Sequence, residues 1–467
     1  MRDTVVTLDQ RPTDGPTMWE KAFVVIAFIC STGAFLPLVL GFDYDPGAGM
    51  GILALDVLWA IIFGIAFYLL FRERRSVVVD LKGNWIFLLL LGLPFVSAVW
   101  SDHPWITLLA SGALTGTAAI SLYIYWCFTS KQLLSLLGLT LGLCGACSLF
   151  FVIFLPRYGI GTGDFQGQWQ GIYAQKNELG RMMALGFLVF LLFFEFSRPR
   201  KYRYLALAGF MLALVYTAQS ATSLVVCLSL PVVLWATKVM IVPSRHRTRR
   251  IVIVVFLSVS LLWIAAVHFE EITTALGRDE GLSGRATLWS LAVGAIQEQP
   301  FLGYGYEAFW RGGGERADEI WKQFGQFLYF SHNGILEVWL ALGLLGVLGV
   351  LGSFGVLSSR ALRLIRWRFT LETAWPVLFL WYLVVVNMTD DYLLNFHSLP
   401  TILFFIVVLR IPRDIWVAST GRLAGRSENY AKLCPRTLHK RYLSPGISKT
   451  IASGPRNGEG ELAGTTE

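Results

Sequence analysis

Runs of about 20 apolar residues recur along this chain from Ala22 to Arg410, and each is long enough to cross a bilayer as an α-helix. This feature limits the fold more than any other. The composition agrees, because 55% of the 467 residues are hydrophobic and only 15% are charged, whereas a soluble domain carries about 25% charged residues. The sequence therefore predicts an all-α, polytopic membrane protein.

Twelve transmembrane helices are predicted. They lie at about residues 22–41, 50–71, 84–100, 105–128, 133–155, 174–195, 203–218, 221–241, 250–267, 334–357, 373–390 and 395–411. Residues 1–19 are polar, and the first apolar run is too long for the core of a signal peptide, which indicates a retained helix. We expect residues 20–411 to form one membrane domain and the polar residues 412–467 to form a disordered tail.

The charges in the loops predict the orientation. The short loops of one set hold only Arg157. The other set holds eighteen Lys and Arg residues, in the segments 72–82, 131, 198–203, 238–250 and 360–368. Because such residues accumulate in cytoplasmic loops, this set and both termini are predicted to be cytoplasmic. The same placement accounts for the net charge of +8 without a nucleic-acid partner.

Two connections on the predicted outer side are long, residues 156–173 and residues 268–330. In the longer connection, apolar residues recur at helical spacing over 285–297. This pattern predicts an amphipathic helix that lies against the membrane face. A second helix is predicted at about 316–328.

The first cluster of ionisable residues, 175–181, opens the sixth predicted span. It places Arg181 about 7 Å inside that helix at a rise of 1.5 Å per residue. A cation at this depth is costly unless it is paired, and it is a functional candidate by default. The structural alternative is an ion pair between Glu178 and Arg181, with Lys176 reaching toward the interface.

The second cluster places Arg285 at the start of the predicted amphipathic helix. A cation there opposes the helix dipole, which indicates a nearby anion, because helix N-termini and arginine both suit phosphate. The alternative is a solvated surface arginine.

The third cluster, Ser331-His332-Asn333-Gly334-Ile335-Leu336-Glu337, lies where the long loop enters the tenth span. His332 can accept a proton near neutral pH, although a lone interfacial histidine is more often structural. Asp390, Asp391 and His397 lie at the last outer turn, where they could form a polar lid or pair with the arginines.

The sequence contains no P-loop, HExxH or GxSxG motif and no ligand clusters at metal spacing. Neither a metal nor another cofactor is therefore expected.

Taken in order, these clusters resemble the O-antigen ligase and polymerase family, and in particular its ExoQ-type exopolysaccharide branch. The matching stretches are residues 175–181, Leu276-Gly277-Arg278-Asp279 with Ser283-Gly284-Arg285 and Trp289, residues 300–306, and Ser331-His332-Asn333-Gly334. The order of the motifs, the long outer loop and the roughly twelve spans all fit, so that the resemblance covers residues 20–411.

The resemblance implies metal-independent glycosyl transfer from undecaprenyl pyrophosphate at the periplasmic face of a bacterial inner membrane. Carried over, Arg181 and Arg285 would hold the pyrophosphate, and His332 would accept the proton of the attacking hydroxyl. The expected substrate contacts are Lys176, Asn177, Asn333, Trp289 and Tyr304. The implied partners are an undecaprenyl-pyrophosphate-linked oligosaccharide, membrane lipid, and proteins for export or chain-length control.

Aromatic residues of the outer loops are candidates to stack on sugar rings, or else to anchor loops at the interface. They are Trp169, Tyr304, Tyr306, Trp310, Trp321 and Tyr329.

The first interpretation is a polymerase of exopolysaccharide or O-antigen repeats. One alternative is a ligase that transfers a finished glycan to lipid A core or to a protein. Another is a transporter of lipid-linked oligosaccharide, although a carrier would place its charges near the bilayer midplane.

The orientation can be tested with an impermeant maleimide added to intact cells. A cysteine introduced at Gly313 should react from outside, because the long loop is predicted to face outward, whereas the native Cys434 should not. Labelling of position 313 from the cytoplasmic side alone would contradict the orientation.

Overall fold

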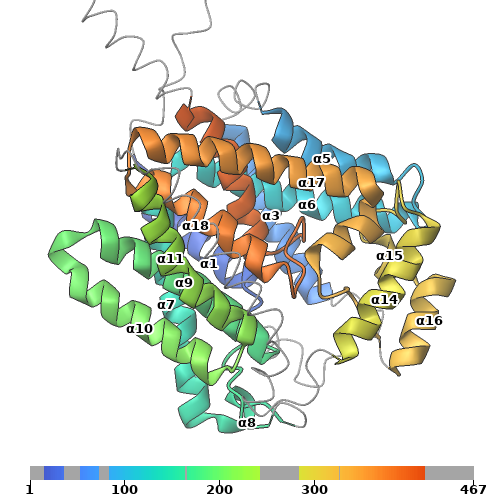
Figure 1. Ribbon diagram of the computed structural model, residues 1–467, viewed down its shortest axis with the longest axis horizontal. Helices are drawn as coiled ribbons and strands as arrows, with labels where there is room; N and C mark the ends of the chain where they lie inside the picture. Colours follow the sequence, from blue (N-terminus) through green and yellow to red (C-terminus); the bar gives the residue numbers. More distant parts are fainter. Residues whose placement is uncertain are drawn as a thin grey trace, which may run out of the picture. The chain divides into compact units, whose positions relative to one another are not determined.

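A computed structural model of the chain describes residues 15–35, 53–72, 84–162, 166–241, 283–325 and 327–415. Within these ranges the regular elements are helices, apart from one isolated β-bridge between Ile160 and Trp169. The all-α fold is thus confirmed (Figure 1). The described elements up to residue 414 belong to one compact unit.

Each predicted span that falls at least partly within the described residues overlaps a helix, although the first one, predicted for 22–41, is helical only as far as Ser31. These are α1 (Met18–Ser31), α3 (Leu53–Arg72), α5 (Trp85–Ser97), α6 (Pro104–Cys127), α7 (Ser130–Phe154), α9 (Lys176–Phe196), α10 (Lys201–Thr217), α11 (Ala221–Ile241), α17 (Gly334–Trp367), α18 (Leu371–Val386) and a last helix at 399–415. Two shorter pieces, α8 (Pro156–Gly159) and η2 (Arg198–Arg200), lie in connections.

Six of these helices, α3, α6, α7, α9, α11 and α17, are long and apolar enough to cross a membrane. They identify a multi-pass membrane protein, while the total of twelve spans stays a prediction. The predicted span at 250–267, the motif at 276–279 and the predicted tail beyond residue 415 lie outside the described residues.

Helix α9 is the most enclosed of the six, with 78% of its most apolar window buried. It packs against α7, α10, α11 and α18. Gly180 permits the close contact of α9 with Ser220, the residue before α11. A Cβ atom on residue 180 would lie only 2.6 Å from Cβ of Ser220, which is too close for two carbon atoms. The residues at the start of α9 are therefore held by protein on several sides.

The long connection contains three helices, α14 (Ser283–Glu298), α15 (Ala308–Gly312) and α16 (Glu315–Phe324). The two predicted helices are confirmed, although the second ends before residue 328, because Gly325 adopts φ 66° and terminates it. The short α15 was not predicted.

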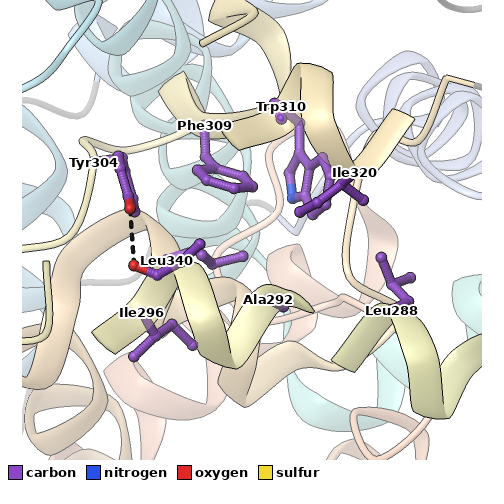
Figure 2. Close-up of a cluster of buried hydrophobic side chains, with 10 residues drawn as sticks. Leu288, Ala292, Ile296, Tyr304, Phe309, Trp310, Ile320 and Leu340 are labelled. Carbon is purple, nitrogen blue, oxygen red and sulfur yellow. Dashed lines mark hydrogen bonds between the residues drawn. The ribbon is translucent and has the colours of Figure 1, made fainter. Parts of the chain in front are cut away.

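The apolar face of α14 is covered by protein, whereas the sequence predicted that it would lie on the membrane face. Figure 2 shows the cluster that covers it, formed with residues of α15, α16, α17 and the turn after α14. Its members are Leu288, Ala292, Ala295, Ile296, Tyr304, Phe309, Trp310, Ala317, Ile320 and Leu340. The large side chains of Tyr304, Phe309 and Trp310 pack on this face. The apolar pattern within α14 predicts a buried face but does not identify what covers it.

Helix α17 is interrupted at Gly343, which adopts φ 64° and ψ −165°. The segment Pro300–Gly305 docks against the break. The N–H of Tyr304 donates to the carbonyl of Leu340 (2.8 Å), and the N–H of Leu344 donates to the carbonyl of Pro300 (2.8 Å). Backbone groups on both sides of the break thereby gain partners, which a buried interruption of a membrane helix requires.

Substituting Gly343 with Ala should destabilise the protein. The new Cβ would collide with the carbonyl of Phe301, and φ 64° is itself unfavourable for a residue with a side chain. We expect a loss of about 1–3 kcal/mol, seen as a lower midpoint of thermal denaturation in detergent. Gly352→Ala is the matched control in the same helix, since nothing lies within 4 Å of its Cβ position. Equal midpoints for the two variants would contradict this account of the break.

Candidate functional site

Four stretches that are far apart in the sequence meet at one end of the helices. They are the start of α9, the start of α14, the segment before α17 and the turn after α18. Arg181 of α9 forms an ion pair with Asp390 of that turn. The indole N–H of Trp289 in α14 donates to the carbonyl of Ser331, just before α17 (3.0 Å). Because the N–H of Gly334 also donates to the carbonyl of Asn387 in the turn after α18 (2.9 Å), the three clusters identified in the sequence lie in one region.

Arg181 is buried and paired. Its side chain is 10% exposed and that of Asp390 is 6% exposed. The guanidinium also lies over the ring of Tyr392, 5.1 Å from its centroid, and the hydroxyl of Tyr382 donates to the Arg181 carbonyl (3.2 Å). Among the described residues, the carboxylate that pairs with Arg181 is therefore Asp390 and not Glu178, one turn before it in the helix. Of the two roles considered for Asp390, the ion pair is the one that the structure contains.

Arg285 lies half-buried in the first turn of α14. Burial and the positive charge of Arg181 lower the pKa of the Arg285 guanidinium, which nevertheless stays protonated at neutral pH. Two guanidinium groups within electrostatic reach of each other repel, and an anion beside both relieves that repulsion. The half-buried position argues against a simply solvated surface arginine.

His332 has an unusual backbone conformation, with φ 54°. Its ring packs edge-to-face against Phe330, with 4.4 Å between the ring centroids. Burial, followed by the charges of Arg285 and Arg181, lowers the pKa of His332 to about 3. The imidazole is therefore neutral at physiological pH, which is the form that can accept a proton.

Three of the expected substrate contacts already use their polar atoms within the protein. The Asn333 side-chain oxygen caps α17 by accepting the N–H groups of Ile335 (3.0 Å) and Leu336 (3.2 Å). The hydroxyl of Tyr304 donates to the carbonyl of Ala295 (2.8 Å). The third is Trp289, through its hydrogen bond to the loop before α17. These residues organise the site, and their contact with substrate stays a prediction.

The remaining two expected contacts lie at the start of α9. Lys176 is its first residue and is 7% exposed, and Asn177 beside it is half-buried. Their position one turn before Arg181 is compatible with a shared anion site, which stays a prediction.

Most of the aromatic residues suggested for sugar stacking also have internal partners. Tyr306 donates to the carbonyl of Leu394 (2.5 Å) and Trp321 to that of Leu328 (2.9 Å). These contacts join the two side chains to other parts of the protein, whereas stacking on sugar rings and anchoring at the membrane interface both stay predictions.

Glu337 is a residue of the third cluster to which the sequence assigned no role. One of its oxygens, Oε2, accepts the N–H of Ser331 (2.8 Å) and the indole N–H of Trp310 (3.1 Å). The sequence feature that could have identified Glu337 is its position one helical turn after Asn333, at i+4. Its tertiary partner on α15 could not be anticipated, because α15 itself was not predicted.

A small cavity of about 20 Å³ lies beside Glu337, which is enough space for about one water molecule. Glu307 and Asp391 also line it. Burial, together with the charges of Glu337 and Glu307, raises the pKa of Asp391 well above its usual range. Within the described ranges, no group of three or more His, Cys, Asp or Glu side chains is arranged to hold a metal ion.

Two comparisons with known proteins bear on this region. The O-antigen ligase family matches residues 204–351, a segment that contains Arg285 and His332 but not Arg181. The exopolysaccharide production protein ExoQ of Rhizobium meliloti (strain 1021) is 25% identical over 278 residues, which are 56% of this chain and 61% of that protein. The chain thus spans less than two thirds of the length of this relative.

The two matches agree with each other, and the all-helical membrane fold agrees with both. On this basis, the chain is similar to the O-antigen ligase family over residues 204–351 and to the exopolysaccharide production protein ExoQ over 278 residues.

Proposed function

We propose that this protein is a polysaccharide polymerase that transfers a growing glycan from undecaprenyl pyrophosphate to a sugar hydroxyl of a second lipid-linked repeat. The observation that carries the proposal is the convergence of Arg181, Arg285 and His332, from three separate parts of the chain, on one end of the helices. We place the reaction at the periplasmic face of the inner membrane, from the charge distribution of the loops.

The arginines stabilise the leaving group in this mechanism. A hydroxyl oxygen of the acceptor attacks the anomeric carbon of the donor, the bond from that carbon to the pyrophosphate oxygen breaks, and its electron pair leaves with undecaprenyl pyrophosphate. Negative charge develops on the diphosphate, and fixed guanidinium groups in a site that excludes water stabilise it. Asp390 holds Arg181 in place through their ion pair.

His332 removes the proton of the attacking hydroxyl. The neutral imidazole accepts it as the new glycosidic bond forms and later releases it to solvent. A direct in-line displacement of this kind inverts the configuration of the anomeric carbon.

A ligase is the second candidate, because the matching family is the O-antigen ligases. The chemistry at the anomeric carbon would be the same, and only the acceptor would differ. A transporter is less well supported, since the charged residues gather at one end of the helices beside a folded loop.

The proposal can be tested with the purified protein and a single lipid-linked repeat as sole substrate. A polymerase should yield a ladder of longer lipid-linked glycans, also in the presence of EDTA. Arg181→Ala, Arg285→Ala and His332→Ala should each reduce the rate by about 10²–10³-fold, and Arg285→Lys should also be impaired, because a single ammonium group lacks the bidentate fork.

Arg316→Ala is the matched control for this experiment. Arg316 belongs to the same long loop, but its ion pairs with Glu298 and Glu319 are exposed, so that its loss should leave the rate unchanged. Full activity of His332→Ala would contradict the assignment of His332 as the general base.

A second experiment separates polymerase from ligase in cells. If the protein is a polymerase, deletion of its gene should leave single lipid-linked repeats. Long lipid-linked polymer that is never attached to an acceptor would instead identify a ligase.

The pH dependence should reflect the lowered pKa of His332. Because that pKa lies near 3 in the free enzyme, the neutral base persists as the pH falls below 6.5, and kcat/KM should decline only at clearly lower pH. Bound diphosphate offsets the charges of Arg285 and Arg181, which raises the pKa, so that kcat should decline at higher pH than kcat/KM does. A decline in kcat/KM at pH 6.5 or above would contradict this assignment.

A further inference from the structure

His332 occupies a backbone conformation that its surroundings must maintain. A left-handed residue with a side chain costs on the order of 1–2 kcal/mol, and such conformations persist where neighbouring contacts determine them. His332, with φ 54°, has fixed residues on both sides.

The residue before His332 is held at both of its backbone polar groups. The N–H of Ser331 donates to Oε2 of Glu337 (2.8 Å), and its carbonyl accepts the indole N–H of Trp289 (3.0 Å). Its hydroxyl donates to the carbonyl of Asn333 (3.1 Å), across His332. Ser331 itself is fully buried.

The residues after His332 are held equally closely. Asn333 caps α17, and its side-chain N–H donates to the carbonyl of Met388 (3.4 Å). The N–H of Gly334 donates to the carbonyl of Asn387 (2.9 Å). The turn that carries Asp390, and thereby Arg181, is thus joined to the residues that follow His332.

Glu337 differs from the other residues around His332 because one of its atoms joins two separate elements, the segment before α17 and helix α15. Its Oε2 accepts from Ser331 and also from Trp310 of α15, at 3.1 Å. Both interactions need an acceptor oxygen, and neither needs a negative charge. Trp289 lies at i+4 from Arg285 on α14, so that both side chains share one face of that helix.

We propose that Glu337 and Trp289 are positioning residues, which hold His332 in its left-handed conformation beside Arg285. Neither residue takes part in bond making or breaking. This inference rests on the proposed function, in which His332 is the base.

The test compares Glu337→Leu, Glu337→Gln and Trp289→Phe in the assay with the lipid-linked repeat. Displacing a reacting group by about 1 Å can cost 10²-fold in rate. We therefore expect Glu337→Leu to lower kcat by about 10–100-fold with KM little changed. Glu337→Gln should recover most of that loss, because its amide oxygen can accept the same two N–H groups. Trp289→Phe keeps an aromatic ring but lacks the indole N–H that donates to the carbonyl of Ser331, so that it should lower kcat several-fold. Glu319→Leu, at an exposed carboxylate of α16, is the matched control.

A second measurement does not depend on activity. The rate at which diethyl pyrocarbonate modifies His332, followed by mass spectrometry, should rise several-fold in Glu337→Leu and stay near the wild-type rate in Glu337→Gln. If Glu337→Leu does not fold, Trp289→Phe provides the same two measurements.

The inference is overturned if kcat and His332 reactivity are unchanged in Glu337→Leu and Trp289→Phe. It is also overturned if Glu337→Gln is as inactive as Glu337→Leu, because the charge would then act directly. Failure of the proposed function can be distinguished from failure of this inference. If the proposed function is wrong, His332→Ala is active, whereas the rates of modification of His332 in the other variants still report on the contacts that hold its backbone.

Discussion

A buried arginine in a membrane helix requires a buried partner, and much of this structure follows from that requirement. Arg181 obtains its partner from the turn after α18, through Asp390. The pairing fixes α9 relative to α18, and the same turn is hydrogen-bonded to the residues on which α17 begins. One ion pair therefore connects α9, the most enclosed of the six long apolar helices that the structure describes, to the segment that carries His332. Breaking such a pair on one side leaves an uncompensated buried charge, at a cost of about 3–5 kcal/mol.

The folded part of the long connection forms a layer of its own beside the helices. Its core is built around the apolar face of α14 and includes Leu340 from the first part of α17. The layer is joined to α17 again where the segment Pro300–Gly305 meets the break at Gly343. Arg285 thus sits on a helix that is anchored by both apolar packing and backbone hydrogen bonds, as the preorganisation of a charged group requires.

The sequence predicted those features that depend on local pattern. Apolar runs predicted the helices, the cost of a charge at membrane depth singled out Arg181, and helical periodicity predicted α14. Features that depend on contacts across the fold could not be predicted in the same way. The choice of Asp390 over Glu178 as the partner of Arg181 is set by tertiary packing. The hydrogen bonds of Trp289 to Ser331 and of the Asn333 amide to Met388 likewise involve residues that are distant in the sequence, and Tyr304 donates to Ala295 from a turn that was not predicted.

The break at Gly343 divides α17 between two environments. Residues 344–367 extend about 36 Å at a rise of 1.5 Å per residue, which exceeds the roughly 30 Å of a hydrocarbon core. This part is therefore sufficient to cross the bilayer by itself. Residues 334–342 need not contact lipid, and they are available for the polar partners of Glu337 and Asn333. Because the helix is interrupted, the sequence of residues 344–367 can suit lipid while the sequence of residues 334–342 suits polar protein contacts.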